Sequence, residues 1–319
     1  MKQIALFLDG TWQDAADNTN ISKMFNLITD DSVVKYYDAG VGTAKSWWDK
    51  VTGGLFGSGV QKNILQAYDF LRTNYEEGDE VFVFGFSRGA FTARSLVGFL
   101  DLVGLPGRHS QLSTKKLFNI YREKDYDTVG RLITTEQTDD VKVKMIGVFD
   151  TVKSIGSPIN ITGINKNWKF HNSSLCVNTE NAFHAIAIDE ERENFKAVYW
   201  TEKTESQHVS QRFFSGSHSD VGGGGDNIAS IVPLSWMIRN AKECGLKIDM
   251  TQERANAKLP SLENSYDEMF YGMYSKISSP YSRPINSSIL GLEIDYSVTH
   301  RLKNDSYKPV NLLNYLKTI

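Results

Sequence analysis

Short apolar runs alternate along this chain with stretches in which apolar residues recur at helical spacing. The runs are rich in β-branched and aromatic residues, which is typical of strands buried in a parallel sheet. They cover residues 4–8, 33–37, 81–84 and 141–149, and helical spacing is found at 21–29, 60–75, 90–103 and 114–123. This alternation predicts an α/β fold, with a mostly parallel central sheet flanked by helices.

The second half of the chain has a less regular pattern. We interpret 181–188 as helical, 195–201 and 209–214 as strands, and 228–244 as a helix that ends at Gly245. Beyond about residue 250 the chain is polar and only weakly periodic. We therefore predict a catalytic core over residues 1–250 and a C-terminal cap or extension, 251–319, packed on the same domain.

Residues 40–59 contain six glycines together with Trp47 and Trp48. A glycine-rich segment of this length with large apolar side chains is unusual for a plain connection and favours a binding loop. The alternative is that both tryptophans fold back onto the core. We expect Trp47, Trp48 and Phe86 to contact the substrate.

The segment Gly85-Phe86-Ser87-Arg88-Gly89 lies between the predicted strand at 81–84 and a predicted helix. A G-x-S-x-G sequence in this context is typical of a nucleophile elbow, in which a strained turn raises the serine hydroxyl above the sheet. Serine flanked by glycine also occurs in ordinary turns. The strand before it and the helix after it favour Ser87 as a nucleophile.

Three predicted strand ends carry groups suited to acyl transfer, in the chain order Ser87, Asp150, His218. A serine hydroxyl needs an imidazole to accept its proton, and a buried carboxylate to orient that imidazole. The same order occurs in α/β-hydrolases. Among the other histidines, we expect His184 to be packed in the core and the rest to be solvated, namely His109, His171, His208 and His300.

The tetrahedral intermediate of acyl transfer needs two hydrogen-bond donors for its oxyanion. The first candidate is the backbone N–H of Arg88, directly after the serine. The second is expected from the turn after the first strand, at Gly10 or Thr11. Two interpretations of the Arg88 side chain remain open: it binds a substrate phosphate, or it pairs with a carboxylate.

The strand-end aspartates allow an alternative chemistry. Asp9, Asp150 and Asp220 could together hold a hard cation, as in a metal-dependent phosphoester hydrolase. We prefer the interpretation in which Asp9 and Asp220 brace loops by accepting backbone N–H bonds, and we expect no metal and no cofactor. A second alternative is a catalytically silent binding module on the same fold.

Charge and composition limit the binding partners and the cellular location that we expect. The net charge of −3 predicts no electrostatic binding of nucleic acid. The apolar run at 4–8 is too short for a signal peptide or a membrane span, so we expect a cytoplasmic protein where it is synthesised. Two cysteines, Cys176 and Cys244, fit no metal spacing and are expected to be free thiols.

Four segments together resemble the α/β-hydrolase domain of the type VI secretion phospholipase effectors and their relatives. They are Leu8-Asp9-Gly10-Thr11-Trp12, Gly85–Ala90, Gly147–Val152 and Phe214–Gly223. The resemblance implies a serine esterase or lipase with Ser87, Asp150 and His218 as its triad, acting on a carboxylic ester of a phospholipid. It also implies delivery out of the cell without a signal peptide, and a secretion or immunity partner.

Overall fold

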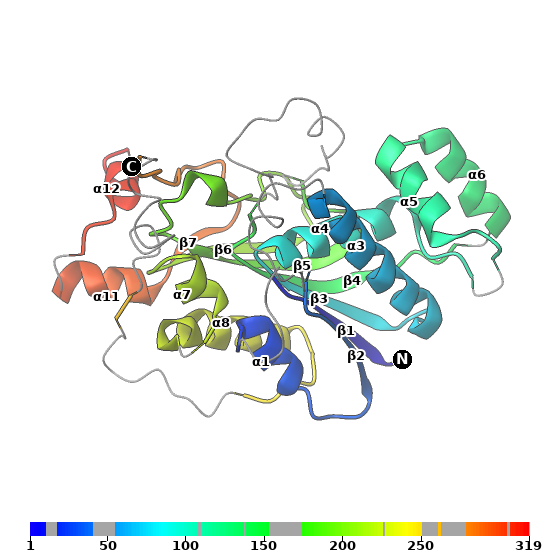
Figure 1. Ribbon diagram of the computed structural model, residues 1–319, viewed down its shortest axis with the longest axis horizontal. Helices are drawn as coiled ribbons and strands as arrows, with labels where there is room; N and C mark the ends of the chain where they lie inside the picture. The colour runs from blue at the N-terminus through cyan, green and yellow to red at the C-terminus, as the bar shows by residue number, and fades with distance from the viewer. Residues whose placement is uncertain are drawn as a thin grey trace.

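A computed structural model describes residues 1–10, 18–40, 55–107, 110–136, 138–152, 174–225, 227–250, 261–262, 279–304 and 307–318. Its centre is a seven-stranded sheet with the strand order β2-β1-β3-β4-β5-β6-β7 (Figure 1). Every neighbouring pair in this sheet is parallel. The strands are β1 (Gln3–Leu8), β2 (Val33–Asp38), β3 (Glu80–Phe86), β4 (Val143–Phe149), β5 (Thr179–Ala187), β6 (His208–Phe214) and β7 (Leu292–Ile294).

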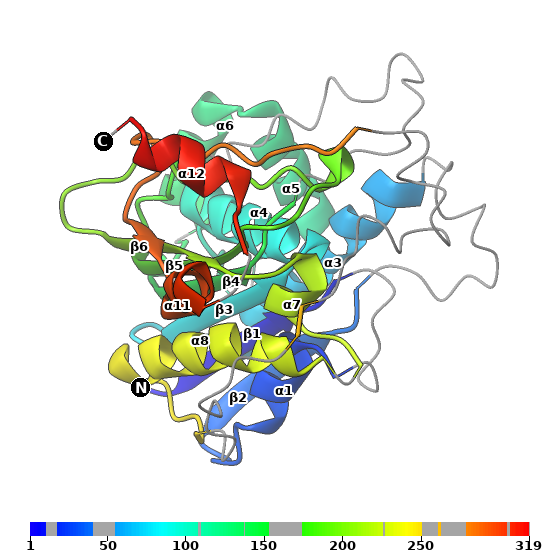
Figure 2. The ribbon, with the colours of Figure 1, turned by 90° about the vertical axis from the view of Figure 1, so that its left-hand side faces the viewer.

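Helices cover both faces of the sheet (Figures 1 and 2). On one face lie α3 (Leu55–Asn74), α4 (Arg88–Val103) and α5 (Thr114–Glu123), with α6 (Tyr126–Glu136) beside them. On the other lie α1 (Asn20–Asn26), α7 (His218–Gly222) and α8 (Ile231–Glu243). Two more helices follow β7, α11 (Tyr296–Asn304) and α12 (Val310–Leu316). No described helix is long and apolar enough to cross a bilayer.

Side chains of a single strand divide between two cores. In β1, Ile4 and Leu6 pack with α3 and α4, whereas Ala5 and Phe7 pack with α1 and α8. Strand side chains point alternately to opposite faces, so a strand covered by helices on both sides is apolar at every position. The predicted strands at 4–8, 33–37, 81–84 and 141–149 are all confirmed, and burial on both faces explains the apolar runs of β1, β3 and β4.

The strand order places a topological switch point between β1 and β3. The chain passes from β1 to β2 on one side and then returns to form β3 on the other side of β1. Crossover connections leave in opposite directions at such a point, which opens a crevice at the carboxyl ends of the strands where ligands commonly bind. Asp9 follows β1 here, and Ser87 follows β3.

Two sequence-based interpretations of the second half are wrong. Residues 181–188 form most of the central strand β5 rather than a helix, because burial on both faces gives this strand an almost continuous apolar run. Residues 195–201 form no strand of the sheet. They begin in a short 3₁₀ turn, 193–195, and contribute one bridge between Val152 and Ala197.

The other element predictions differ from the structure only in detail. The helix expected at 228–244 is divided into a 3₁₀ turn, 228–230, and α8, with Gly245 at a positive φ just beyond the helix end. The N-cap of α1 is Thr19, whose hydroxyl accepts the Ser22 N–H. Cys176 and Cys244 are free thiols, as expected.

The described C-terminal residues pack at the β6 edge of the sheet. β7 pairs with β6, and Ile285, Val298 and Leu312 share a cluster with Ile186 of β5 and Phe213 of β6. The sequence analysis predicted no helix or strand in this region, because its apolar positions are few and separated by loops. The domain boundary at residue 250 stays a prediction.

Candidate active site

Ser87 lies on the turn between β3 and α4 with φ 58° and ψ −120°. Such a positive φ is strained for a residue with a side chain and costs on the order of 1–3 kcal/mol unless the surroundings enforce it. Here the Ser87 N–H donates to the carbonyl of Phe149 at the end of β4, at 3.0 Å. The turn therefore has the strand–turn–helix geometry that the sequence predicts.

The glycines two residues either side of Ser87 have no room for a side chain. A Cβ on Gly85 would lie 2.6 Å from the Cα of Ala90, and one on Gly89 would lie 2.1 Å from the carbonyl oxygen of Leu8. Both contacts are with backbone, which cannot move without disturbing β1 or α4. The spacing of the two glycines is thus required by the tight packing of this turn.

His218, the first residue of α7, joins Ser87 to Asp150. Its Nε2 is 2.8 Å from the Ser87 Oγ, and its Nδ1 is 2.5 Å from Asp150 Oδ2. The three residues are 8%, 7% and 0% exposed for Ser87, His218 and Asp150. Residues far apart in the sequence thus form one buried hydrogen-bonded chain of hydroxyl, imidazole and carboxylate.

The backbone that carries His218 is held by carboxylates. Three consecutive N–H groups, of residues 216 to 218, donate to Asp189, Asp220 and Glu190 at 2.6, 2.7 and 3.2 Å respectively. The Asp220 contact belongs to a capping box at the start of α7. Asp220 therefore braces the His218 loop, as the sequence analysis preferred.

Asp150 is bound by an arginine that the sequence analysis missed. Arg283 donates from Nη1 to Asp150 Oδ1 at 2.5 Å and from Nη2 to Asp150 Oδ2 at 2.9 Å. The Ala187 N–H also donates to Oδ1, at 3.0 Å. Arg283 lies in a polar stretch without periodicity, and no local pattern marks it as a partner of so distant a residue.

Burial and charge act in opposite directions on these groups. Burial alone would raise the pKa of Asp150, but the Arg283 charge and the hydrogen bond from His218 outweigh it and hold that pKa below its usual range. For His218, burial lowers the pKa and the neighbouring Asp150 only partly offsets this effect. At neutral pH the site therefore holds an ionised carboxylate and a neutral imidazole.

Aromatic rings enclose the imidazole. The ring centroids of Phe86 and Phe195 lie 4.7 and 4.9 Å from that of His218. Phe86 is also packed against Gly222, where a Cβ would come within 1.9 Å of the ring. Phe86 is buried beside His218, and its contact with the substrate stays a prediction.

Of the expected oxyanion-hole donors, Arg88 and Gly10 lie among the described residues. Arg88 is the first residue of α4, where the helix itself offers no acceptor for the backbone N–H. The Gly10 N–H donates to Oδ1 of Asp9 at 2.7 Å. Thr11, Trp47 and Trp48, with most of the proposed binding loop, lie outside the described residues.

Asp9 also accepts two hydroxyl hydrogen bonds, from Thr19 at 2.5 Å and from Tyr37 at 2.8 Å. These contacts support a bracing role for its carboxylate. Within the described ranges, no three His, Cys, Asp or Glu side chains are grouped so that they could hold a metal ion. Arg88 is half-buried, and desolvation lowers the pKa of its guanidinium to about 9.

The remaining histidines are dispersed. His184 is fully buried in β5, as a packed histidine, although on a strand rather than a helix. His208 is exposed at the start of β6, and His300 is half-buried in α11. His109 and His171 lie outside the described residues.

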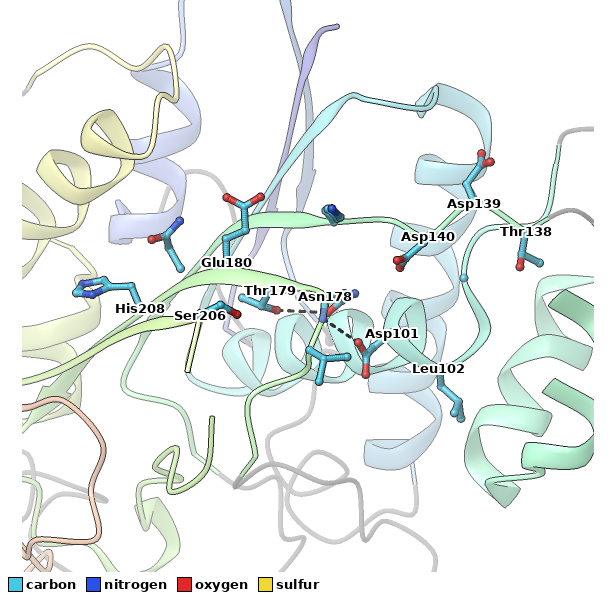
Figure 3. A pocket seen from close by; sticks show the side chains of 14 residues that line it. Asp101, Leu102, Thr138, Asp139, Asp140, Asn178, Thr179, Glu180, Ser206 and His208 are labelled. Carbon is cyan, nitrogen blue, oxygen red and sulfur yellow. Dashed lines mark hydrogen bonds between the residues drawn. The ribbon is translucent and has the colours of Figure 1, made fainter. Parts of the chain in front are cut away.

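A cavity of about 770 Å³ opens at the opposite edge of the sheet (Figure 3). Its lining comes from the end of α4 and the amino ends of β4, β5 and β6, and includes Asp101, Asp139, Asp140 and Glu180. Ser87, Asp150 and His218 follow the carboxyl ends of their strands. This cavity is therefore separate from the candidate triad.

Comparison with known proteins adds a family match. Residues 2–240 match the family model described as T6SS, phospholipase effector Tle1-like, catalytic domain. An uncharacterized protein of Saccharomyces cerevisiae, YEL023C, is 28% identical over an alignment of 230 positions, which covers 63% of this chain and 33% of the yeast protein.

Two solved structures are also similar. One is an uncharacterized protein from Pseudomonas aeruginosa, with 14% identity and a TM-score of 0.46 over 78% of this chain and 47% of that one. The other is the Tle1 effector bound to the VgrG spike of the type VI secretion system, with 20% identity and a TM-score of 0.40 over 71% and 51%. The chain thus spans about half the length of these two structures and a smaller share of the yeast relative.

Proposed function

We propose that this chain, which belongs to the Tle1-like catalytic-domain family of type VI secretion phospholipase effectors, is a serine hydrolase that cleaves an acyl ester of a phospholipid. The observation that carries the proposal is the position of His218, with one ring nitrogen at the Ser87 hydroxyl and the other at the Asp150 carboxylate. Hydroxyl, base and orienting acid in this order form a serine-hydrolase triad.

In the proposed reaction, Ser87 Oγ bonds to the ester carbonyl carbon while its proton passes to His218 Nε2. The tetrahedral intermediate then expels the alcohol, which takes that proton and leaves as lysophospholipid. Water attacks the acyl-enzyme and gives a proton to His218, and the proton returns to Ser87 as the fatty acid departs. Asp150 holds Nδ1–H, so that Nε2 faces the serine as an acceptor.

The oxyanion of each intermediate would be stabilised by the Arg88 N–H at the start of α4. The partial positive charge of the helix N-terminus adds to this stabilisation. Removing one such donor commonly lowers kcat by roughly 10²–10³. Gly10 could act as the second donor only if its N–H turned away from Asp9.

The family suggests a setting for this reaction. Its description names phospholipase effectors of type VI secretion. We infer that this chain is made in the cytoplasm and delivered out of the cell by a secretion system of that kind, through a secretion partner. An immunity partner that blocks the site in the producing cell follows from the same proposal.

Incubation of the protein with phosphatidylcholine and phosphatidylethanolamine vesicles tests the proposal, with mass spectrometry of the lipid extracts. We expect lysophospholipid and fatty acid in equal amounts from the wild type and none from Ser87→Ala. A fluorophosphonate probe should label the wild type but not Ser87→Ala. Unchanged hydrolysis by Ser87→Ala would contradict the proposal.

A chelator provides the control for metal-dependent chemistry. We expect EDTA to leave both hydrolysis and probe labelling unchanged. Loss of turnover with EDTA, together with no labelling of Ser87, would favour the phosphoesterase alternative. Absence of both turnover and labelling, with or without EDTA, would favour a binding module.

A further inference from the structure

Arg283 is buried against the candidate triad from outside the family-matched segment. It is 1% exposed, and residues 2–240 are those that match the family model. Besides the two bonds to Asp150, its Nη1 donates to the Ala187 carbonyl at 2.8 Å and its Nη2 to the Phe195 carbonyl at 2.6 Å. Its terminal nitrogens thus bind one carboxylate and two backbone segments.

The paired contact fixes more than a charge. Without Arg283, each oxygen of the Asp150 carboxylate would keep one hydrogen bond, from His218 and from the Ala187 N–H. Two parallel bonds from a planar guanidinium hold both oxygens, and therefore the plane of the carboxylate. Oδ2 of Asp150 lies between Arg283 Nη2 and His218 Nδ1, at 2.9 and 2.5 Å.

Contacts of the residues on either side of Arg283 hold it in place. The neighbouring Tyr281 N–H donates to the Glu191 carbonyl at 2.7 Å, and Ile285 packs in the cluster with Ile186 and Phe213. The arginine is therefore anchored on both sides by the ends of β5 and β6. Its position depends on the packing of the C-terminal residues on the sheet.

We propose that Arg283 is a positioning residue of the hydrolysis: it holds the Asp150 carboxylate ionised and oriented toward His218, so that His218 Nε2 stays directed at the Ser87 hydroxyl. This inference rests on the proposed function. The C-terminal residues then complete the triad, because they supply Arg283. Residues 1–250 alone would leave the buried Asp150 carboxylate without this positive charge beside it.

The charge argument fixes the direction of the pH effect. Without Arg283, burial raises the pKa of Asp150, because the charge that chiefly outweighs burial is absent. The other charged groups that act on His218, Arg192 and Glu190, are unchanged in such a variant. Whichever of the two groups binds the extra proton, the pair becomes protonated at a higher pH. The acid limb of the rate profile must therefore move upward, whereas a purely structural arginine would leave it in place.

The test compares pH profiles of phospholipid hydrolysis for the wild type, Arg283→Lys and Arg283→Met. We expect kcat to fall at least roughly tenfold in Arg283→Met with KM little changed, because the substrate does not touch the arginine. The acid limb should move up by about half a pH unit or more, and Arg283→Lys should lie between. A lysine keeps the charge but cannot bind both oxygens in one plane.

Glu293→Gln is the matched control. Glu293 of β7 accepts from Nε of Arg212 on β6 at 2.7 Å, so it also joins the C-terminal residues to the sheet through an arginine, away from Asp150. We expect this variant to keep both the wild-type acid limb and kcat. An equal shift in Glu293→Gln would assign the effect to loosened packing and overturn the proposal.

A readout without turnover covers variants whose activity is too low to measure. In the inactive Ser87→Ala background, NMR titration of His218 should give a higher pKa when Arg283→Met is added, and a smaller rise when Arg283→Lys is added. An unchanged pKa, with an unchanged acid limb, would overturn this inference while leaving the triad intact. Hydrolysis that survives Ser87→Ala would instead overturn the proposed function itself.

Discussion

Two buried histidines stand beside the end of β4 and have different surroundings. His218 opens α7 and binds Asp150, whereas His184 lies within β5 and its Nε2 accepts the Thr151 N–H at 3.0 Å. They are 7% and 0% exposed. Burial lowers the pKa of both imidazoles, to about 3 in the case of His184, where the charge of Arg94 adds to the effect.

The difference lies in what each ring nitrogen contacts. His184 has a backbone N–H on one side and the Gln211 amide oxygen on the other, at 3.4 Å, and the edge of Trp200 packs against it. None of these groups can give it a proton. His218 instead lies between a hydroxyl and a carboxylate. A neutral, buried imidazole is therefore a base only where its neighbours can exchange the proton.

The largest expected difference between the two sites is in turnover. We expect His218→Asn to lower kcat by about 10⁴ or more, because the imidazole is the base that is hydrogen-bonded to Ser87 Oγ and takes its proton. His184→Asn should change kcat by less than about tenfold. Lipid hydrolysis rates, with circular dichroism as a check on folding, measure both. Similar losses in the two folded variants would remove the distinction.

The second expected difference is in stability at low pH. Since burial holds the pKa of His184 near 3, below its value of 6.5 in the unfolded chain, the unfolded state binds the extra proton first. Stability therefore falls as pH drops from 6.5 toward 3, by up to about 5 kcal/mol. Urea denaturation at pH 7 and pH 4 should show a smaller difference for His184→Asn than for the wild type. An equal difference would count against this account.

His218 should control the acid limb of the reaction. Because burial lowers its pKa, the imidazole stays neutral below its ordinary value, and kcat/KM should begin to fall only below about pH 6.5. The expected slope is about tenfold per pH unit. Rates on a short-chain ester between about pH 4 and 8 measure this limb. A midpoint above about 7 would contradict the direction of the shift.

The smallest expected effect concerns how each histidine is held. His184 is held by a central strand, but the His218 loop depends on the capping box of Ser217 and Asp220. Ser217→Ala should cost about 1 kcal/mol of stability, as for other N-caps. It should lower kcat by less than about tenfold, since two further carboxylates hold the loop. Ser206→Ala, at an exposed turn before β6, is the control and should leave both unchanged.

The elements predicted best from the sequence are those whose apolar pattern fits only one type of secondary structure. The runs at 4–8 and 81–84 could only be buried strands, because they are short, rich in β-branched or aromatic residues and bounded by polar turns. The run at 181–188 failed, since Asn, His and three alanines give a central strand a spacing that also suits a helix. Local periodicity cannot distinguish the two when both faces are buried.

The candidate site also contains residues that the sequence predicted and residues that it did not. Ser87, Asp150 and His218 were found because each follows a strand end, and parallel strands bring those ends to one edge. Arg283 could not be found, because nothing near it in the chain indicates that it reaches Asp150. The hydrogen bond of the Gly10 N–H could not be found for a related reason: it depends on a side chain, Asp9, that turns back onto its own loop.

By itself, the sequence determined the α/β class, the tight turn around Ser87 and the order of the three reactive groups, because each depends on residues close together in the chain. The tertiary structure alone decided which arginine balances the buried carboxylate and which glycine N–H is already occupied. Those outcomes depend on contacts between distant segments, whose distances and burial no local pattern encodes.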